Sequence, residues 1–362
     1  MRGALGLGLG LVIGAAFGGA ACGSDEPADT GFNAGNDASV DAFLGSDASI
    51  WPDVDLTPDA GPGPSPGFDG GDAGPPSVSC TGKTGKQGSA ISVSVESGGR
   101  KRTSLLHVPD KYDPGAGAML VLNFHGFMSA GWQQALLSRM SQESDQRGFI
   151  VAYPEGVSTS WNAGDCCGVA WTDGVDDVKF VRDLLDAIEA EWCIDKKRIF
   201  ATGMSNGGFF SHRLACSLSD RIAAVAPVAG VLGIEPNTCT PYRPMPILDI
   251  HGSSDGMVPY GGGTPLVPQL GVGLVFRSVP ETMEFWRQKN GCSTFEQEIF
   301  AKGDARCVRY PDCQAGVGTV HCRIDGGGHT WPGGLAIPAG KTSTDLSATT
   351  TMLDFFEANS LP

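Results

Sequence analysis

From Cys80 onward, short apolar runs alternate with segments of helical length. Residues 91–97 and 102–109 alternate apolar and polar positions with a period of two, which predicts half-buried strands. Further strands are expected at 118–126, 149–156, 197–203, 222–230, 245–252 and 319–328. Helical spacing predicts helices at 132–148, 175–192, 208–218, 280–291 and 344–359. Buried strands that alternate with helices predict an α/β fold, with a mostly parallel, doubly wound sheet covered by helices on both faces.

The first 22 residues have the pattern of a secretory signal. A single basic residue, Arg2, precedes an uncharged, glycine-rich apolar stretch that is too short to span a membrane. The stretch ends in "GGAAC", which places Cys22 where bacterial lipoproteins carry their lipid, although Gly19 stands where that pattern prefers leucine. We therefore expect a secreted, extracellular protein whose one membrane contact is a lipid anchor at Cys22. Cleavage and release without a lipid is the alternative.

Residues 23–79 have the composition of a disordered linker. This segment is rich in Asp, Gly and Pro, and it holds eleven acidic residues and no basic one. Such a segment cannot bury a core, so a solvated spacer is the main interpretation and calcium binding by the spaced aspartates is the alternative. It also accounts for most of the net charge of −15, so the folded domain expected at 80–362 has no basic surplus with which to bind nucleic acid.

Ten cysteines follow Cys22, an even number that suits disulfides in an oxidising compartment. No two of them have C-x-x-C spacing, so no metal site is expected. The expected bridges are Cys307–Cys322, Cys292–Cys313 and Cys216–Cys239. Because neighbouring cysteines bond to each other only with strain, we expect separate partners for Cys166 and Cys167, and Cys80 and Cys193 are left for them.

One serine lies between glycines at a junction of predicted strand and helix. Residues 203–207, "GMSNG", match G-x-S-x-G, the sharp turn that lifts a serine hydroxyl clear of the backbone. The small flanking residues suit such a turn. Ser205 is therefore the candidate nucleophile, and a simple helix N-cap is the alternative.

A serine nucleophile needs an imidazole base and an acid that orients it. His329 follows the last expected strand on the glycine-rich loop "DGGGHTWPGG", and Asp255 follows the strand at 245–252. The chain order Ser205, Asp255, His329 is the order that the α/β-hydrolase fold uses. Asp249 is the rival acid, although it lies within the strand. The remaining histidines are expected to be structural, namely His107, His125, His212, His251 and His321.

An oxyanion hole requires two backbone N–H groups that converge on one point. Asn206 follows the nucleophile directly and supplies the first candidate. Phe127 follows Gly126 at the end of an early strand and supplies the second. His125 is interpreted as a residue that shapes this loop.

Several longer motifs carry a resemblance to a known family. They are "LNFHG", "WNAGDCCG", "VDDVKFVRDLL", "CIDKKRIFATGMSNGG", "HGSSDGMVPY" and "GGGHTWPGG". Over residues 80–360 the chain resembles secreted esterases of the polyhydroxybutyrate-depolymerase type, which are related to feruloyl and acetylxylan esterases. The resemblance implies a catalytic triad of Ser205, Asp255 and His329. Relatives often carry a smaller residue or cysteine at position 127, so Phe127 bears on the shape of the pocket.

These features predict a serine carboxylic-ester hydrolase that needs no cofactor. Because a neutral histidine is the base, activity is expected to fall below roughly pH 6 to 7. The expected substrates are hydroxybutyrate oligomers or feruloyl and acetyl esters on xylan. Trp161 and Trp331 are candidates to stack on such substrates, and packing is the alternative. No large lid domain is expected, and a peptidase of the same fold or a non-catalytic surface-binding lipoprotein are the rival functions.

Overall fold

A computed structural model describes residue 67, residues 78–265 and residues 274–362. The chain divides into two units, Met1–Pro58 and Asp59–Pro362, and only residues of the second are described. The expected signal segment, Cys22 and nearly all of the expected linker lie outside the described residues.

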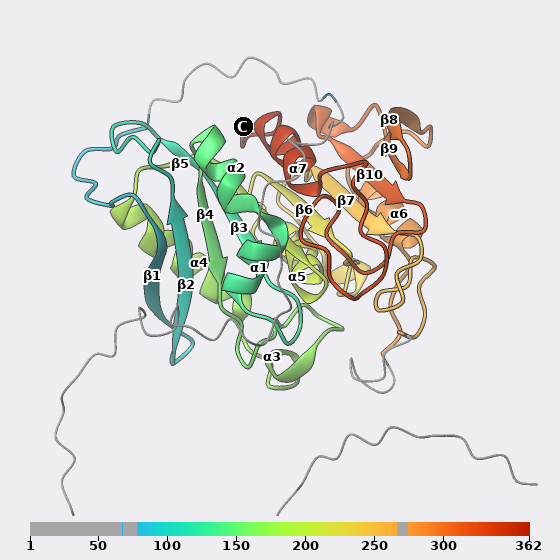
Figure 1. The fold of residues 1–362 in the computed structure, drawn as a ribbon, viewed down its shortest axis with the longest axis horizontal. Helices are drawn as coiled ribbons and strands as arrows, with labels where there is room; N and C mark the ends of the chain where they lie inside the picture. Colours follow the sequence, from blue (N-terminus) through green and yellow to red (C-terminus); the bar gives the residue numbers. More distant parts are fainter. Residues whose placement is uncertain (1–66, 68–77, 266–273) are drawn as a thin grey trace, which may run out of the picture. The chain divides into compact units, whose positions relative to one another are not determined.

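Ten strands form one sheet, in the order β1-β2-β4-β3-β5-β6-β7-β10-β9-β8 (Figure 1). Their bounds are β1 Gly88–Ser97, β2 Arg100–Val108, β3 Ala118–Phe124, β4 Ile150–Pro154, β5 Ile194–Met204, β6 Ala224–Val228, β7 Ile247–Gly252, β8 Gln297–Lys302, β9 Ala305–Arg309 and β10 Thr319–Ile324. The six central strands, from β4 to β10 in this order, run parallel to one another, and the two strands at each edge pair in the antiparallel sense. The predicted mostly parallel sheet is therefore confirmed.

The helices cover both faces of the sheet. Their bounds are α1 Gly131–Ser138, α2 Met140–Arg147, α3 Gly168–Thr172, α4 Asp177–Glu191, α5 Asn206–Ser217, α6 Val279–Lys289 and α7 Ala348–Glu357. Buried side chains of α4, α5 and α6 belong to one apolar core, and those of α2 and α7 belong to a second core. Every residue of β3 is buried, as a strand covered on both faces requires.

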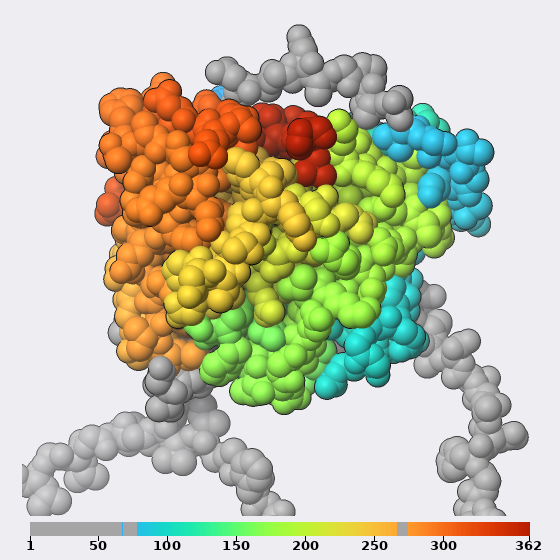
Figure 2. All heavy atoms as spheres, turned by 180° about the vertical axis from the view of Figure 1, so that it is seen from behind, coloured from blue at the N-terminus to red at the C-terminus, as the bar shows by residue number. Residues whose placement is uncertain are grey.

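The cyan first strands and the orange segment that follows α6 lie at opposite sides of the rear surface (Figure 2). The green and yellow middle of the chain forms the surface between them. This arrangement follows from the strand order, in which β1 and β8 are the two edges.

Two predictions about elements differ from the structure. The expected helix at 132–148 is divided into α1 and α2 by Arg139, whose left-handed backbone (φ 53°) ends one helix and precedes the next. Strand β8 was not expected; only Ile299 and Phe300 at its centre are half-buried and the other residues are exposed, so the strand buries little apolar surface.

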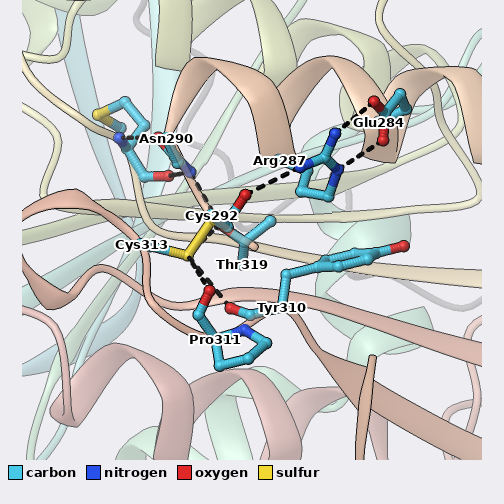
Figure 3. Close-up of a disulfide and its surroundings, with 9 residues drawn as sticks. Glu284, Arg287, Asn290, Cys292, Tyr310, Pro311, Cys313 and Thr319 are labelled. Atoms are coloured by element: carbon cyan, nitrogen blue, oxygen red, sulfur yellow. Dashed lines mark hydrogen bonds and ion pairs between the residues drawn. A yellow bond between two sulfur atoms is a disulfide. The ribbon is translucent and has the colours of Figure 1, made fainter. Parts of the chain in front are cut away.

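Five disulfides tie this domain together, and the three bridges expected from the sequence are confirmed. Cys307–Cys322 joins paired positions of β9 and β10, Cys216–Cys239 anchors the end of α5, and Cys292–Cys313 joins the segment after α6 to the approach of β10. Around the last bridge, Asn290 donates to Met245 O at 2.7 Å and to Thr319 Oγ1 at 2.9 Å (Figure 3). The bridges therefore reinforce the β7–β10 half of the sheet.

The prediction for the other four cysteines was wrong. Cys166 and Cys167 bond to each other, and Cys80 bonds to Cys193 with their Cα atoms 5.2 Å apart. The reason is the path of the first described residues along the end of α4: Gly85 N donates to Glu191 O, and Trp192 Nε1 donates to Lys86 O. This path brings Cys80 against Cys193, and the vicinal pair is left with no other partner.

Among the described residues, no helix has both the length and the apolar character needed to cross a membrane.

We expect the Cys80–Cys193 bridge to contribute more stability than Cys216–Cys239. The first closes a loop of 113 residues and the second a loop of 23, and the stabilising effect of a bridge on the unfolded chain grows with the loop that it closes. Replacing both cysteines of the first pair by alanine should lower the free energy of unfolding by about 2 to 4 kcal/mol, and replacing the second pair should cost about 1 kcal/mol less. Urea denaturation of both double variants measures this, and a larger loss for the shorter loop would contradict it.

Candidate active site

Ser205 lies at the junction of β5 and α5 with a backbone conformation that few residues adopt. Its φ is 57° and its ψ is −123°, and its amide donates to Val228 O at 2.9 Å. The turn brings the backbone of β5 and α5 against that of β3, so a Cβ atom at Gly203 or Gly207 would collide with Phe124 O. Glycine is therefore required on both sides of the serine. The Ser205 side chain makes no capping bond to α5, which contradicts the simple N-cap interpretation.

Asp255 and His329 form a short hydrogen-bonded pair. His329 Nδ1 donates to Asp255 Oδ2 at 2.7 Å, and both side chains are buried. The backbone holds each partner: His329 N donates to Ala339 O, and Asp255 Oδ1 accepts from Met257 N and Val258 N at 2.8 Å each. Because the Nδ1 proton is committed to Asp255, neutral His329 carries its lone pair on Nε2.

The surroundings keep Asp255 ionised. Burial by itself raises the pKa of a carboxyl group, but the charge and hydrogen bonds of His329 and His251 outweigh burial and hold the pKa of Asp255 well below its usual value. A carboxylate that stays charged can orient an imidazole and stabilise its protonated form.

The three residues lie at one edge of the sheet. Ser205 follows β5, Asp255 follows β7 and His329 follows β10, and these strands run parallel through β6. The carboxyl ends of parallel strands meet at the same edge, where open α/β sheets place their sites. The rival acid Asp249 lies inside β7 and accepts instead from His321 Nδ1 at 2.9 Å.

The two candidate oxyanion donors lie beside the serine. Asn206 is the first residue of α5, where backbone N–H groups have no partner within the helix. Phe127 follows Gly126, at which an added Cβ would lie 3.4 Å from the Ser205 Cβ. The Asn206 side chain is engaged elsewhere, since it accepts from Trp161 N and donates to Trp161 O. That pair of bonds fixes the loop after β4 against the nucleophile turn.

His125 shapes the loop after β3, as the sequence suggested. Its Nδ1 donates to Gly126 O at 2.7 Å and its Nε2 accepts from Gly156 N at 3.0 Å, so the ring is neutral. Burial lowers the pKa of His125 to about 4, in agreement with this neutral form.

The suggestion that Trp161 and Trp331 stack on substrate is wrong. Both side chains are 0% exposed. Trp161 stacks on Phe180 and Phe210 in the core, and Trp331 donates its indole N–H to Thr349 Oγ1 at 2.9 Å. The alternative interpretation, packing, holds for both.

Exposed apolar side chains lie instead on two neighbouring segments that sequence reasoning passed over. Met128 and Trp132 come after β3, and Val169 and Trp171 belong to α3 after β4; Met128 is 71% exposed and Trp171 41%. Phe127 joins the segments, because its ring fills the space beside Gly168. Figure 1 shows α3 and α1 at the same end of the sheet. We call Met128, Trp132, Val169 and Trp171 the apolar rim.

Across the part of the chain that the structure describes, no group of three or more His, Cys, Asp or Glu side chains is placed to hold a metal ion.

Comparison with known proteins relates the chain to esterases. Residues 111–259 match the family model "Esterase PHB depolymerase". Feruloyl esterase B of Piromyces equi is 35% identical over 235 residues, which cover 63% of this chain and 42% of that protein, so the chain spans less than half of its length. The putative esterase NocK of Nocardia uniformis subsp. tsuyamanensis is 31% identical over 280 residues, covering 71% of this chain and 79% of that protein.

Among solved structures, the acetyl xylan esterase from Aspergillus awamori has the same fold, with a TM-score of 0.50 and 16% identity over 74% of this chain and 99% of that chain. The match to the family model and the similarity to NocK over most of its length together show that the chain belongs to the PHB depolymerase family of esterases.

Proposed function

We propose that the protein is a serine carboxylic-ester hydrolase in which Ser205 is the nucleophile, His329 the base and Asp255 the acid. The observation that carries this proposal is the Asp255–His329 pair at the sheet edge where the turn presents Ser205. Acyl transfer requires a serine hydroxyl and an imidazole that a carboxylate orients, and this sheet edge carries both the Ser205 turn and the Asp255–His329 pair.

The reaction proceeds in two steps. His329 Nε2 removes the proton of Ser205 Oγ while that oxygen attacks the ester carbonyl, and the protonated imidazole then gives the proton to the departing alcohol. Water attacks the resulting acyl-enzyme with the same exchange of protons, which releases the acid and restores Ser205. The amides of Phe127 and Asn206 stabilise the oxyanion in both steps.

The apolar rim points to esters that carry an apolar or aromatic group. Feruloyl esterases and an acetyl xylan esterase are among the similar proteins, and the matched family is named for polyhydroxybutyrate depolymerase. We infer that the substrates are esters of polyesters or plant cell walls, such as hydroxybutyrate oligomers or feruloyl and acetyl groups on xylan. Exposed Trp and Met side chains supply flat, polarisable contact area for such groups.

We further propose that this domain acts outside the cell, either held at the envelope through a lipid on Cys22 or released. Its five disulfides suit an oxidising compartment.

The first test compares the full chain with its Ser205→Ala variant on p-nitrophenyl acetate, methyl ferulate, acetylated xylan and 3-hydroxybutyrate oligomers. We expect the wild type to cleave at least one of these esters and the variant to lose roughly a thousandfold or more in kcat/KM, because the nucleophile is gone. The matched control is Ser211→Ala on the same helix, whose hydroxyl bonds only to Gly207 O and which should stay within about threefold of wild type.

Two outcomes would overturn this proposal. If the wild type cleaves none of the four esters, a peptidase or a non-catalytic binding protein becomes the better hypothesis. If Ser205→Ala retains activity, another residue is the nucleophile.

Within the apolar rim, we expect Trp171→Ala to lower kcat/KM for methyl ferulate by about five- to tenfold while kcat/KM for p-nitrophenyl acetate changes less than about twofold. The loss of a flat contact surface should affect the ester with the larger acyl group. Phe295→Ala is the control, because Phe295 is also exposed but precedes β8 at the far edge of the sheet. Equal losses on both esters would refute a role of Trp171 in substrate choice.

A further inference from the structure

A cleft of about 280 Å³ opens between the start of β2 and the loop after β4, and we call it the basic cleft. Residues 100–103 line it from β2, and residues 155–157 line it from the loop. Because β2 is antiparallel to β4, with Ser104 paired to Pro154, the first residues of β2 lie where β4 ends. The basic cleft is therefore at the carboxyl edge of the parallel strands, the edge that holds the proposed triad. Figure 1 shows the start of β2 and α3 at this end of the sheet.

Hydrogen bonds join the loop after β4 to the loop that carries one of the proposed oxyanion amides. Gly156 N donates to His125 Nε2 at 3.0 Å, and Met128 N donates to Thr159 O at 2.9 Å. From the nucleophile outward, the strands follow in the order β5, β3, β4 and β2. Because neighbouring strands lie about 4.8 Å apart, the basic cleft is about 10 to 14 Å from the Ser205 turn. A substrate that extends from Ser205 to the cleft crosses the Met128 segment of the apolar rim.

Two cations that line the basic cleft have no ionic partner in the part of the chain that the structure describes. Arg100 and Lys101 are both exposed, and neither forms an ion pair with a described carboxylate. Glu96 is the neighbour of Lys101 across the β1–β2 ladder, but it is exposed and the two side chains form no ion pair. The charges of Arg100 and Lys101 are therefore open to an anion that enters the cleft.

Arg102, the third cation of the lining, is fixed and its charge is compensated. It is 5% exposed, and its Nη2 donates to Asp177 Oδ1 at 2.7 Å and to Glu155 O at 3.2 Å. Its guanidinium carbon lies 3.9 Å from the centroid of the Phe180 ring. These contacts leave Nε and Nη1 without a hydrogen-bond partner among the described residues. Arg102 thus holds the shape of the cleft and adds donors beside it, without adding to its net charge.

One carboxylate, Glu155, also lines the cleft. Its Oε1 accepts from Gly131 N at 2.9 Å, and its Oε2 lies 3.8 Å from His125 Nε2. Burial raises the pKa of Glu155, which further weakens its negative charge. Since Asp177 compensates Arg102, the two free cations against Glu155 leave the cleft one surplus positive charge. Such a surplus suits a single carboxylate, whereas a polyanion would need the extended basic surface that this acidic chain lacks.

We propose that the basic cleft is a subsite for a carboxylate carried by the ester substrate, remote from the ester that Ser205 attacks. The proposal rests on the proposed function, since it concerns the substrate of that site. Arg100 offers a carboxylate two parallel N–H donors, and Lys101 offers a point charge. Two of the proposed substrate types can carry such a group: a hydroxybutyrate oligomer has a free acid end, and xylan can bear uronates.

The remoteness of the cleft determines which kinetic constant it affects. A contact about 10 Å or more from the reacting carbonyl is made equally in the ground state and the transition state, so it lowers KM and leaves kcat nearly unchanged. Because Arg100 and Lys101 are exposed, their attraction for a carboxylate is modest and weakens as salt is added.

The first experiment compares acid substrates with neutral counterparts in wild type and in the double variant Arg100→Gln/Lys101→Gln. One pair is 3-hydroxybutyrate oligomers of increasing length and their N-methyl amides; the other is acetylated uronate-bearing xylan and the same polymer after carboxyl reduction. We expect the double variant to lower the ratio of kcat/KM for acid over neutral substrate about fivefold in at least one pair, mainly through KM. In the oligomer pair, the wild-type preference should begin only at the length that spans the distance from Ser205 to the cleft.

The matched control is Lys196→Gln/Lys197→Gln, which removes two neighbouring exposed cations at the start of β5, at the opposite edge of the sheet. Its ratio should stay within about twofold of wild type. A loss confined to one pair of substrates identifies the source of the carboxylate. An unchanged ratio in both pairs, or equal losses on acid and neutral substrates, would overturn the proposal.

The second experiment needs no turnover, so it separates the subsite from the esterase assignment. Isothermal titration calorimetry with the Ser205→Ala variant measures binding of a 3-hydroxybutyrate oligomer acid, of a xylo-oligosaccharide with one uronate, and of their neutral counterparts. We expect at least one acid to bind about fivefold more tightly than its counterpart. This advantage should disappear when Arg100→Gln/Lys101→Gln is added, and it should shrink at high salt.

The two assignments fail in different ways. If wild type hydrolyses no ester but the binding advantage of the acid remains, the carboxylate subsite stands and the esterase assignment is rejected. If wild type hydrolyses esters but acid and neutral probes bind equally, or neither binds, the subsite is refuted and the esterase assignment stands.

Discussion

The burial of the Asp255 carboxylate is the constraint on which the site depends. A buried carboxylate is stable only when donors surround it, and those donors come from different parts of the chain. The turn after β7 contributes the amides of Met257 and Val258, the loop after β10 contributes His329, and β7 itself contributes His251. The parallel β7–β10 ladder and the nearby disulfides hold these segments in register. Much of the C-terminal half of the domain therefore serves to keep one charge in place.

The Ser205 turn imposes a second constraint on the other half of the domain. The close approach of β5, α5 and β3 leaves no room for a side chain at residues 203 and 207. The side-chain amide of Asn206 holds the backbone of Trp161 through two hydrogen bonds. Trp161 in turn fills the core beneath α4 and α5. A residue from the family-like motif "WNAG" thus supports the turn from below, and this explains why a tryptophan so near the serine is buried.

Local pattern and chain order predict what depends on neighbours in sequence. Apolar runs located the central strands, G-x-S-x-G located the turn at Ser205, and the loops after the strands located Asp255 and His329. The pattern could not show which side of the loop after β4 faces the core, so it left the role of Trp161 open between substrate stacking and packing. It also could not show that residues 80–86 follow the end of α4, and the pairing of Cys80 depends on that long-range path. Arg139 breaks the helix through a backbone angle that a helical composition does not reveal.

Two of the aspartate–histidine pairs in this domain join histidine Nδ1 to a buried carboxylate, and their places relative to the sheet distinguish them. Asp249 and His321 lie within paired strands, and His321 is bonded to a tyrosine hydroxyl whose raised pKa makes it a poor nucleophile. Asp255 and His329 lie past the ends of the same two strands, six and eight residues further along, at the edge where Ser205 is presented. Hydrogen bonding alone would not separate a structural pair from a proposed catalytic one. The position of a pair relative to the strand ends distinguishes the two, because only beyond the ends of the strands can a carboxylate–imidazole pair meet a substrate.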